Sequence, residues 1–162
     1  MKVVGIVATL MFPETHPMTF LIFFVDGKKF ALPVASIDRV ISAVELTTVP
    51  ETPDSISGVI NVHGLVIPVV NIRKRFHLKE RDLSVNDRFI ISNTLSHTVA
   101  LWVDAVGEVV ESTSESVVGA DSITFGFDFI EGVTKVHGDI VPIPDITRLI
   151  LQTDVALSSR TK

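Results

Sequence analysis

The chain reads Gly58-Val-Ile-Asn-Val-His-Gly-Leu-Val-Ile-Pro-Val-Val-Asn-Ile72 in its first half and Gly132-Val-Thr-Lys-Val-His-Gly-Asp-Ile-Val-Pro-Ile-Pro-Asp-Ile146 in its second. Seven of the paired positions are identical, among them the His-Gly step and one proline. Each copy predicts two apolar strands joined by a tight turn, because glycine readily takes the positive φ that such turns require. The pattern is typical of a β-hairpin that has been duplicated within one chain.

Both copies also predict how the hairpin continues. Pro68 and Pro142 cannot donate a hydrogen bond within a sheet, so we expect each at an edge or a bulge. Asn71 and Asp145 belong to the residue types that favour the N-cap of a helix. Apolar residues four positions apart follow each cap, as on the buried face of a helix. The repeated unit is therefore a hairpin followed by a short helix.

The repeat extends upstream, where residues 31–41 align with residues 100–110 at an offset of 69, against 74 for the hairpins. The difference, 74 − 69 = 5, places a five-residue insertion between Val110 and Gly132. Two related halves, at about 18–80 and 88–151, are the main organising feature of the sequence. Because a half of this size would have a marginal core of its own, we expect the halves to pack on each other.

Short apolar runs separated by turn residues fill the rest of both halves. They predict strands at 18–25, 46–49, 88–92 and 97–103, and a kinked strand or helical turn at 34–41. Asp26-Gly27 is typical of a two-residue hairpin turn. Frequent turns, two short helices and a duplication predict a mainly β fold of two small barrels.

Composition excludes several classes of protein. The chain has 162 residues, 46% of them hydrophobic and 20% charged, a net charge of −5 and no cysteine. These values indicate a folded domain without disulfides or thiolate chemistry, and they argue against nucleic acid as a partner. The apolar stretch at 3–12 is too short to span a bilayer. We expect residues 1–17 to be an extension that docks on the body, with a removed signal as the alternative, and residues 152–162 to be a polar tail.

Motifs for catalysis, nucleotide binding or metal binding are absent from the sequence. His63 and His137 repeat because they occupy the same turn, so we predict neither a metal site nor a cofactor. Acidic residues are dense in the second half, and a small β-barrel enzyme that uses them stays open as a minor alternative. The basic run at residues 73–75 is interpreted as the solvated face of a short helix, and Trp102 as core or interface filler.

The residues around the first hairpin resemble the CheW-like family, the coupling proteins of chemosensory arrays. The strongest match is the segment 56–73, Ile-Ser-Gly-Val-Ile-Asn-Val-His-Gly-Leu-Val-Ile-Pro-Val-Val-Asn-Ile-Arg. Further matches lie at residues 20–34, at 37–40 and, in the second half, at 103–110 and 130–133. The resemblance covers about residues 18–151, nearly the whole chain.

The resemblance implies a fold of two SH3-like five-stranded β-barrels that pack on a shared hydrophobic seam. It implies a non-enzymatic adaptor in the cytoplasm, associated with membrane receptor arrays. One barrel would engage the regulatory domain of a CheA-type histidine kinase, and the seam would accept the cytoplasmic tip of a chemoreceptor. Neither nucleic acid nor membrane insertion is expected, nor is a CheV-like fusion to a receiver domain. The partner-binding residues implied by the resemblance are Arg39, Val40, Gly58, Asn61, His63 and Gly64.

Two of these positions depart from the family pattern. Family members usually carry glutamate where this chain has Arg39 and arginine where it has His63. Both residues here are donors, so the usual acid–base pair cannot form. Asp38 is not expected to replace the acid, because neighbouring side chains of a strand point to opposite faces. The departure keeps a second interpretation open, a divergent scaffold for another pathway such as surface motility, and it predicts a partner carboxylate opposite Arg39.

Overall fold

The computed structural model describes residues 17–94, 97–113, 117–119 and 129–149. Almost all of the expected N-terminal extension and the whole expected tail lie outside the described residues. The strands are β1 (Pro17–Val25), β2 (Lys28–Pro33), β3 (Ile37–Ser42), β4 (Ile56–Val62), β5 (Leu65–Asn71), β6 (Arg88–Asn93), β7 (Thr98–Val103), β8 (Ala105–Thr113), β9 (Val117–Gly119), β10 (Ile130–Val136) and β11 (Asp139–Pro144). The helical segments are η1 (Val34–Ser36), α2 (Ile72–Arg75) and a turn at residues 146–149.

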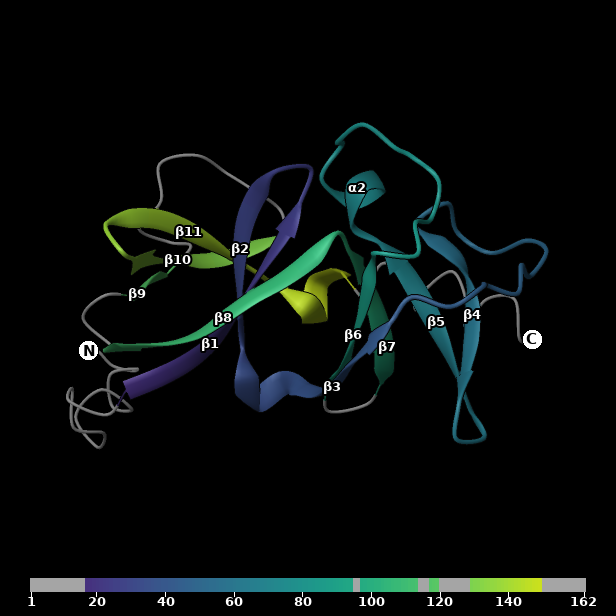
Figure 1. The fold of residues 1–162 in the computed structure, drawn as a ribbon, viewed down its shortest axis with the longest axis horizontal. Coiled ribbons are helices and arrows are strands. Elements are labelled where there is room, and N and C mark those ends of the chain that lie inside the picture. Colours follow the sequence, from purple (N-terminus) through teal and green to yellow (C-terminus); the bar gives the residue numbers. More distant parts are fainter. Residues whose placement is uncertain (1–16, 95–96, 114–116, 120–128, 150–162) are drawn as a thin grey trace.

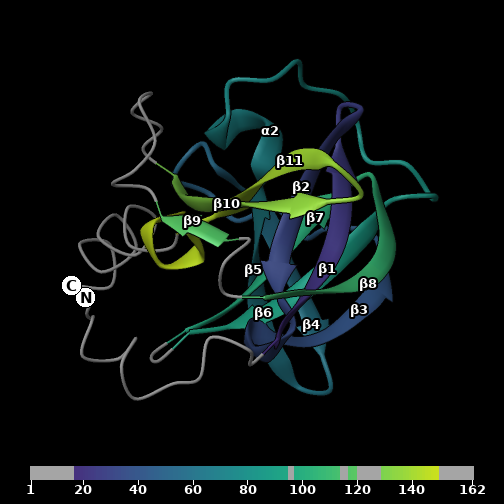
Figure 2. The ribbon, with the colours of Figure 1, turned by 90° about the vertical axis from the view of Figure 1, so that its left-hand side faces the viewer.

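The strands form three sheets in two units, which lie on opposite sides of Figure 1. The first unit is the five-stranded sheet β3-β6-β7-β5-β4. The second unit consists of the three-stranded sheets β2-β1-β8 and β11-β10-β9, and β11 packs against β2. Figure 2 shows β10 and β11 lying across β1 and β2, with β9 beside β10. The predicted mainly β fold with short helices is confirmed, although the described strands form open sheets rather than closed barrels.

The units do not follow the two halves of the sequence. Strands β3, β4 and β5 come from the first half, and β6 and β7 from the second half complete their sheet. The junction within this sheet is the parallel pair of β5 and β7, in which Val69 lies opposite Ala100 and Asn71 opposite Trp102. In return, β1 from the first half pairs with β8 from the second. Each unit therefore needs strands from both halves.

Several strands, among them β1, β6 and β7, are apolar on both faces because they separate two cores. On β1, Phe20 and Ile22 face the core of the second unit, whereas Leu21 and Phe23 face the opposite side. On β6 and β7 the same alternation divides the side chains between the core of the first unit and a central cluster. This central cluster draws residues from the five-stranded sheet, from the β2-β1-β8 sheet and from the 146–149 turn. It is the shared hydrophobic seam that the resemblance implied.

The repeated hairpins have the predicted geometry. His63-Gly64 joins β4 to β5 and His137-Gly138 joins β10 to β11, with φ of 52° and 86° in the first turn and 51° and 85° in the second. Both residues of each turn are left-handed, as in a type I′ turn. Bulges lie at the start of each hairpin, between Ile56 and Gly58 and between Ile130 and Gly132. The duplication is thus preserved in the backbone as well as in the sequence.

The predicted helix caps are confirmed. The Asn71 carboxamide oxygen accepts a hydrogen bond from the Lys74 N–H at 3.2 Å, and the Asp145 carboxylate accepts one from the Arg148 N–H at 3.0 Å. The prediction of a strand at 46–49 is wrong. There the chain makes only an isolated bridge between Thr47 and Val59, because it approaches the bulged end of β4 and leaves it again.

Candidate functional site

The tip of the β4–β5 hairpin places three of the predicted partner-binding residues on one exposed turn. Asn61, His63 and Gly64 are all exposed. The Asn61 side-chain oxygen accepts a hydrogen bond from the Gly64 N–H at 2.8 Å, which closes the turn. Next to it, Leu65 and Val66 are 54% and 60% exposed. The tip is therefore a fixed turn beside apolar side chains that no described residue covers.

Gly58 has a different position from the other predicted residues because it is buried. A Cβ atom at this position would lie 2.7 Å from the Thr47 carbonyl oxygen, closer than such atoms approach. The backbones of Thr47 and Val59 exchange two hydrogen bonds immediately beside it, at 3.0 and 2.9 Å. Glycine is needed here for close approach of the chain, and its role is to support the sheet.

Arg39 and Val40 lie on β3, at the opposite edge of the five-stranded sheet from β4. Both are exposed, and the Nε of Arg39 contacts the Asp38 carboxylate at 2.9 Å. Asp38 and Arg39 meet although neighbouring side chains of a regular strand point to opposite faces. A bulge between Ile37 and Arg39 interrupts the alternation, and a bulge re-aims side chains in this way. Among the described contacts, none joins Arg39 to His63.

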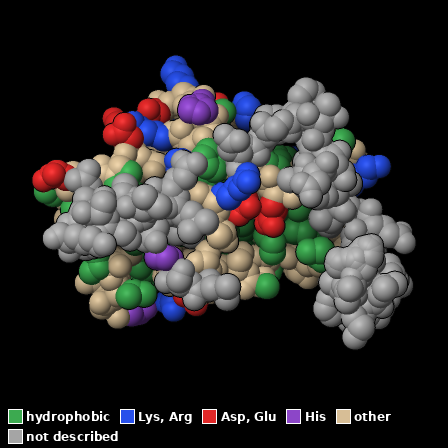
Figure 3. All heavy atoms as spheres, turned by 180° about the vertical axis from the view of Figure 1, so that it is seen from behind, with side chains coloured by type: hydrophobic (Ala, Val, Ile, Leu, Met, Phe, Trp, Pro, Cys, Tyr) green, Lys and Arg blue, Asp and Glu red, His purple; other side chains and the backbone are tan. Residues whose placement is uncertain are grey.

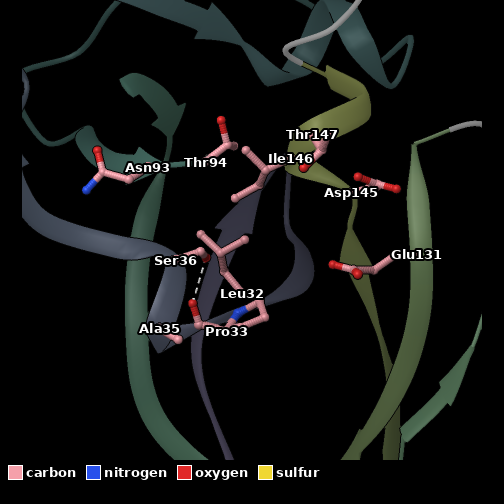
Figure 4. Close-up of a pocket in the computed structure, with 10 residues that line it drawn as sticks. All are labelled: Leu32, Pro33, Ala35, Ser36, Asn93, Thr94, Glu131, Asp145, Ile146 and Thr147. Atoms are coloured by element: carbon pink, nitrogen blue, oxygen red, sulfur yellow. Dashed lines mark hydrogen bonds between the residues drawn. The ribbon is translucent and has the colours of Figure 1, made fainter. Parts of the chain in front are cut away.

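A pocket of about 530 Å³ opens at the seam, where the three sheets and the 146–149 turn converge (Figure 4). We call it the seam pocket. It is lined by Leu32, Pro33, Ala35, Ser36, Asn93, Thr94, Glu131, Asp145, Ile146 and Thr147. Leu32 and Ile146 belong to the central cluster, so the apolar part of the pocket is continuous with the core. Sequence reasoning named the seam but none of these residues as a site, because they come from four separate segments.

One wall of the seam pocket is acidic. Glu131 reaches toward the pocket from β10, and Asp145 lies on the same side at the start of the helical turn (Figure 4). Partial burial raises the pKa of Glu131, and the neighbouring Asp145 carboxylate raises it further. We call these two residues the acidic wall. The remaining polar residues in the described lining of the pocket are neutral.

The basic run after β5 is mostly not the solvated face that the sequence suggested. Arg73 is 8% exposed, and its guanidinium contacts the Asp104 carboxylate at 2.6 Å and the Lys79 carbonyl oxygen at 2.6 Å. Arg75 donates to the Leu149 carbonyl oxygen at 2.9 Å and lies 4.8 Å above the Phe129 ring. The helix carries these residues inward because acceptors from distant segments meet them there.

Arg81 links two carboxylates into one network with Arg73. It forms paired hydrogen bonds to Asp87 at 2.9 and 2.8 Å and contacts Asp104 at 2.9 Å. Asp87 also accepts from the Trp102 indole N–H at 2.9 Å. Burial alone would raise the pKa of Asp87, but hydrogen bonds from Arg81, the Ser84 N–H and Trp102 outweigh it and lower that pKa. Trp102 is buried as predicted.

The rest of the described surface carries charges of both signs. Basic and acidic side chains occur in small groups on the face shown in Figure 3, where no extended basic patch is visible among the described residues. The described residues contain no group of three or more histidine or acidic side chains placed to hold a metal ion. Within the same residues, none of the helices is long and apolar enough to cross a membrane.

Comparison with known proteins places the chain in a family. Residues 19–154 match the CheW-like domain. The chain is 25% identical over 146 residues to chemotaxis protein CheW of Klebsiella aerogenes, with 89% of this chain and 88% of that protein covered. It is 34% identical over 99 residues to chemotaxis protein CheW of Bacillus subtilis, covering 59% of this chain and 64% of that protein.

A solved structure has the same overall arrangement. The scaffolding protein TtCheW from Thermoanaerobacter tengcongensis is similar with a TM-score of 0.73 and 32% sequence identity, and the match covers 80% of this chain and 89% of that chain. The family match includes both repeated hairpins, and the structural match covers most of the chain. The chain therefore belongs to the CheW-like family of chemotaxis scaffold proteins.

Proposed function

We propose that the chain is a non-enzymatic adaptor that couples chemoreceptors to a CheA-type histidine kinase in the cytoplasm, beside membrane receptor arrays. The observation that carries the proposal is the seam pocket, an apolar-floored opening of about 530 Å³ where three sheets meet. A pocket of this size takes a few side chains of a partner rather than a whole protein surface. It suits the helical tip of a receptor, which presents side chains at regular spacing.

The kinase regulatory domain would dock on the first unit. Its contact surface would combine Arg39 and Val40 on β3 with the tip formed by Asn61, His63 and Gly64, while Gly58 supports the sheet from within. The exposed apolar residues next to the tip supply the desolvated area that a stable interface needs. Two separate surfaces, one on the first unit and one at the seam, would let both partners bind at the same time.

Arg39 remains a proposed contact, but the Asp38 carboxylate competes with a partner for its guanidinium. Its ion pair with Asp38 is exposed, so a partner carboxylate can displace Asp38 at small cost. Arg39→Glu is expected to weaken kinase or receptor binding by roughly 1–3 kcal/mol, the scale of one charge-assisted hydrogen bond. Asp38→Asn, the matched control, should leave binding unchanged or strengthen it. Equal affinity of wild type and Arg39→Glu for both partners would remove Arg39 from the interface.

The test of the proposal is calorimetric titration of the full chain with a kinase regulatory domain and with a receptor-tip hairpin, separately and together. Val66→Asp should weaken binding of the kinase domain only, because Val66 lies at the tip. Ala35→Trp should weaken binding of the receptor hairpin only, because Ala35 lines the seam pocket and is exposed. Absence of binding to either partner, or loss of both with each variant, contradicts the proposal.

A second candidate function is a scaffold for a related pathway such as surface motility. The observation that favours it is the pair Arg39 and His63, which stand where the family usually has glutamate and arginine. The structure gives Arg39 a local carboxylate instead of a cross-sheet partner. Titration against regulatory domains of kinases from both kinds of pathway separates the candidates, since only the cognate domain should bind tightly.

A further inference from the structure

In the described part of the chain, no cation pairs with the acidic wall of the seam pocket. Among the described residues, none forms an ion pair or a hydrogen bond with the Glu131 carboxylate. The Asp145 carboxylate accepts a hydrogen bond from the Arg148 backbone N–H, which caps the helical turn. None of the described residues that line the pocket is basic. Two neighbouring carboxylates thus face the same opening, and the described lining supplies no positive charge.

Other carboxylates at the junctions of the fold are paired. Asp104 contacts both Arg73 and Arg81, and Asp87 contacts Arg81. At the surface, Asp139 pairs with Lys29, and Glu108 lies 2.9 Å from His137. The acidic wall differs from these acids in that its partner would have to enter the pocket from outside. Like charges placed together disfavour ionisation, and a cation between them removes that cost.

We propose that the seam pocket selects a partner helix that presents an aliphatic side chain to Leu32 and Ile146 and a lysine or arginine, one turn away, to Glu131 and Asp145. The inference rests on the proposed function, in which the seam accepts a helix, and adds the chemistry of that helix. Side chains three or four positions apart on a helix lie about 5–6 Å from each other, so an apolar residue and a cation can enter one pocket together. Figure 4 shows the apolar residues and the acidic wall facing the same space.

The geometry favours arginine slightly over lysine. A guanidinium has five donors in a plane and can contact two carboxylates at once, whereas an ammonium group acts as a point charge. The neutral side of the pocket, formed by Asn93 and Thr94, offers further oxygen acceptors for the same group. A partner with glutamate at that position would meet two like charges and should be rejected, which is how such a pocket discriminates between helices.

The experiment titrates the full chain with the cytoplasmic-tip hairpin of a chemoreceptor, in wild-type form and with each tip arginine or lysine changed to glutamine. Glu131→Gln/Asp145→Asn should raise the Kd roughly 5- to 30-fold, because a charge-assisted contact in a partly exposed pocket is lost. Asparagine at 145 retains the helix cap. Glu111→Gln, a matched removal of one exposed acid on β8, should leave the Kd unchanged. The hairpin variant that lacks the contacting cation should bind the wild-type chain weakly. Its Kd should then be the same for the wild-type chain and for Glu131→Gln/Asp145→Asn.

Each other outcome has a definite meaning. If Ala35→Trp blocks the hairpin but neutralising the acidic wall does not, the seam is the site and the inference about charge is overturned. If the wild-type chain does not bind the hairpin, or Ala35→Trp has no effect, the proposed function itself fails at the seam. The chain's own Arg160 and Lys162 are a competing source of cation. If changing both to glutamine tightens binding as much as neutralising the wall, the wall serves the tail, and the inference is overturned.

Discussion

Replacing Asp104 by asparagine is expected to destabilise the fold by about 2–4 kcal/mol. Asp104 stands at the turn between β7 and β8 and holds three groups: Arg73 at 2.6 Å, Arg81 at 2.9 Å and the Asp26 N–H at 2.8 Å. In Asp104→Asn the side chain keeps one oxygen, which can still accept a hydrogen bond, but it loses the negative charge of the carboxylate. Since Arg73 is only 8% exposed, its positive charge would stay largely buried after the change.

The magnitude follows from what Arg73 retains. Removing one partner of a buried ion pair typically costs about 3–5 kcal/mol. Arg73 keeps Asp26 at 3.6 Å and the Lys79 carbonyl oxygen, and Asp104 itself is 23% exposed, so the cost should lie somewhat lower. Asp38→Asn is the matched control, because the Arg39–Asp38 pair has a similar distance of 2.9 Å but is exposed on both sides. It should cost less than about 1 kcal/mol.

Urea unfolding measures both variants, followed by the fluorescence of Trp102, the chain's single tryptophan. This residue donates to Asp87 within the same network, so its signal reports on the region that is perturbed. The effect of Asp104→Asn should change little with salt, whereas any effect of Asp38→Asn should diminish. A cost below about 1 kcal/mol for Asp104→Asn, with an unchanged m value, would show that water enters the network and that the reasoning from burial is mistaken.

Three further predictions concern single side chains. The pKa of Asp87 is lowered in the folded chain, so the contribution of this carboxylate to stability is present above about pH 4 and is lost as the pH falls through the folded pKa. The urea midpoint should therefore drop steeply below about pH 4 in wild type and less steeply in Asp87→Asn. Gly58→Ala should cost about 1–3 kcal/mol in urea unfolding, because the added Cβ meets the Thr47 carbonyl oxygen at 2.7 Å, and an unchanged midpoint would mean that the loop yields freely. Asn71→Ala should cost about 1 kcal/mol through loss of the helix cap, and a cost near zero in the same assay would indicate that α2 is held by packing alone.

Local structure was predictable because local residues determine it. The His-Gly turns, the Asn71 and Asp145 caps and the Asp26-Gly27 turn all depend on neighbours within a few positions, and all are found in the structure. The partner of each strand was not predictable in the same way. Strand β7 joins β5 from the other half, and apolar residues alone do not specify which edge a strand meets. The sequence and its family resemblance therefore indicated two intertwined subdomains but not which strands pair across the halves.

Charged residues were the second limit of sequence reasoning. Arg73 and Arg75 follow a strand on a short helix, where a solvated face is the usual outcome. What buries them is the arrival of Asp104, Phe129 and Leu149 from distant segments. The acidic wall escaped notice for the same reason, since Glu131 and Asp145 are fourteen positions apart in a generally acidic half. In each case the relevant partner is close in space and remote in sequence.

The interleaving also bears on the proposed function, in which the chain would hold two partners in a fixed relation. Strands β1, β6 and β7 are each shared between the central cluster and the core of one unit, so neither unit can shift without disturbing the seam. The network of Arg73, Arg81 and Asp104 fastens the same junction from outside, between the β1–β2 turn, α2 and the β7–β8 turn. Close-packed protein interiors have low compressibility, so a displacement of one packed element is passed on to its neighbours. A partner on the first unit and a helix in the seam would therefore be held at one distance and one angle, which is what an adaptor for an ordered array requires.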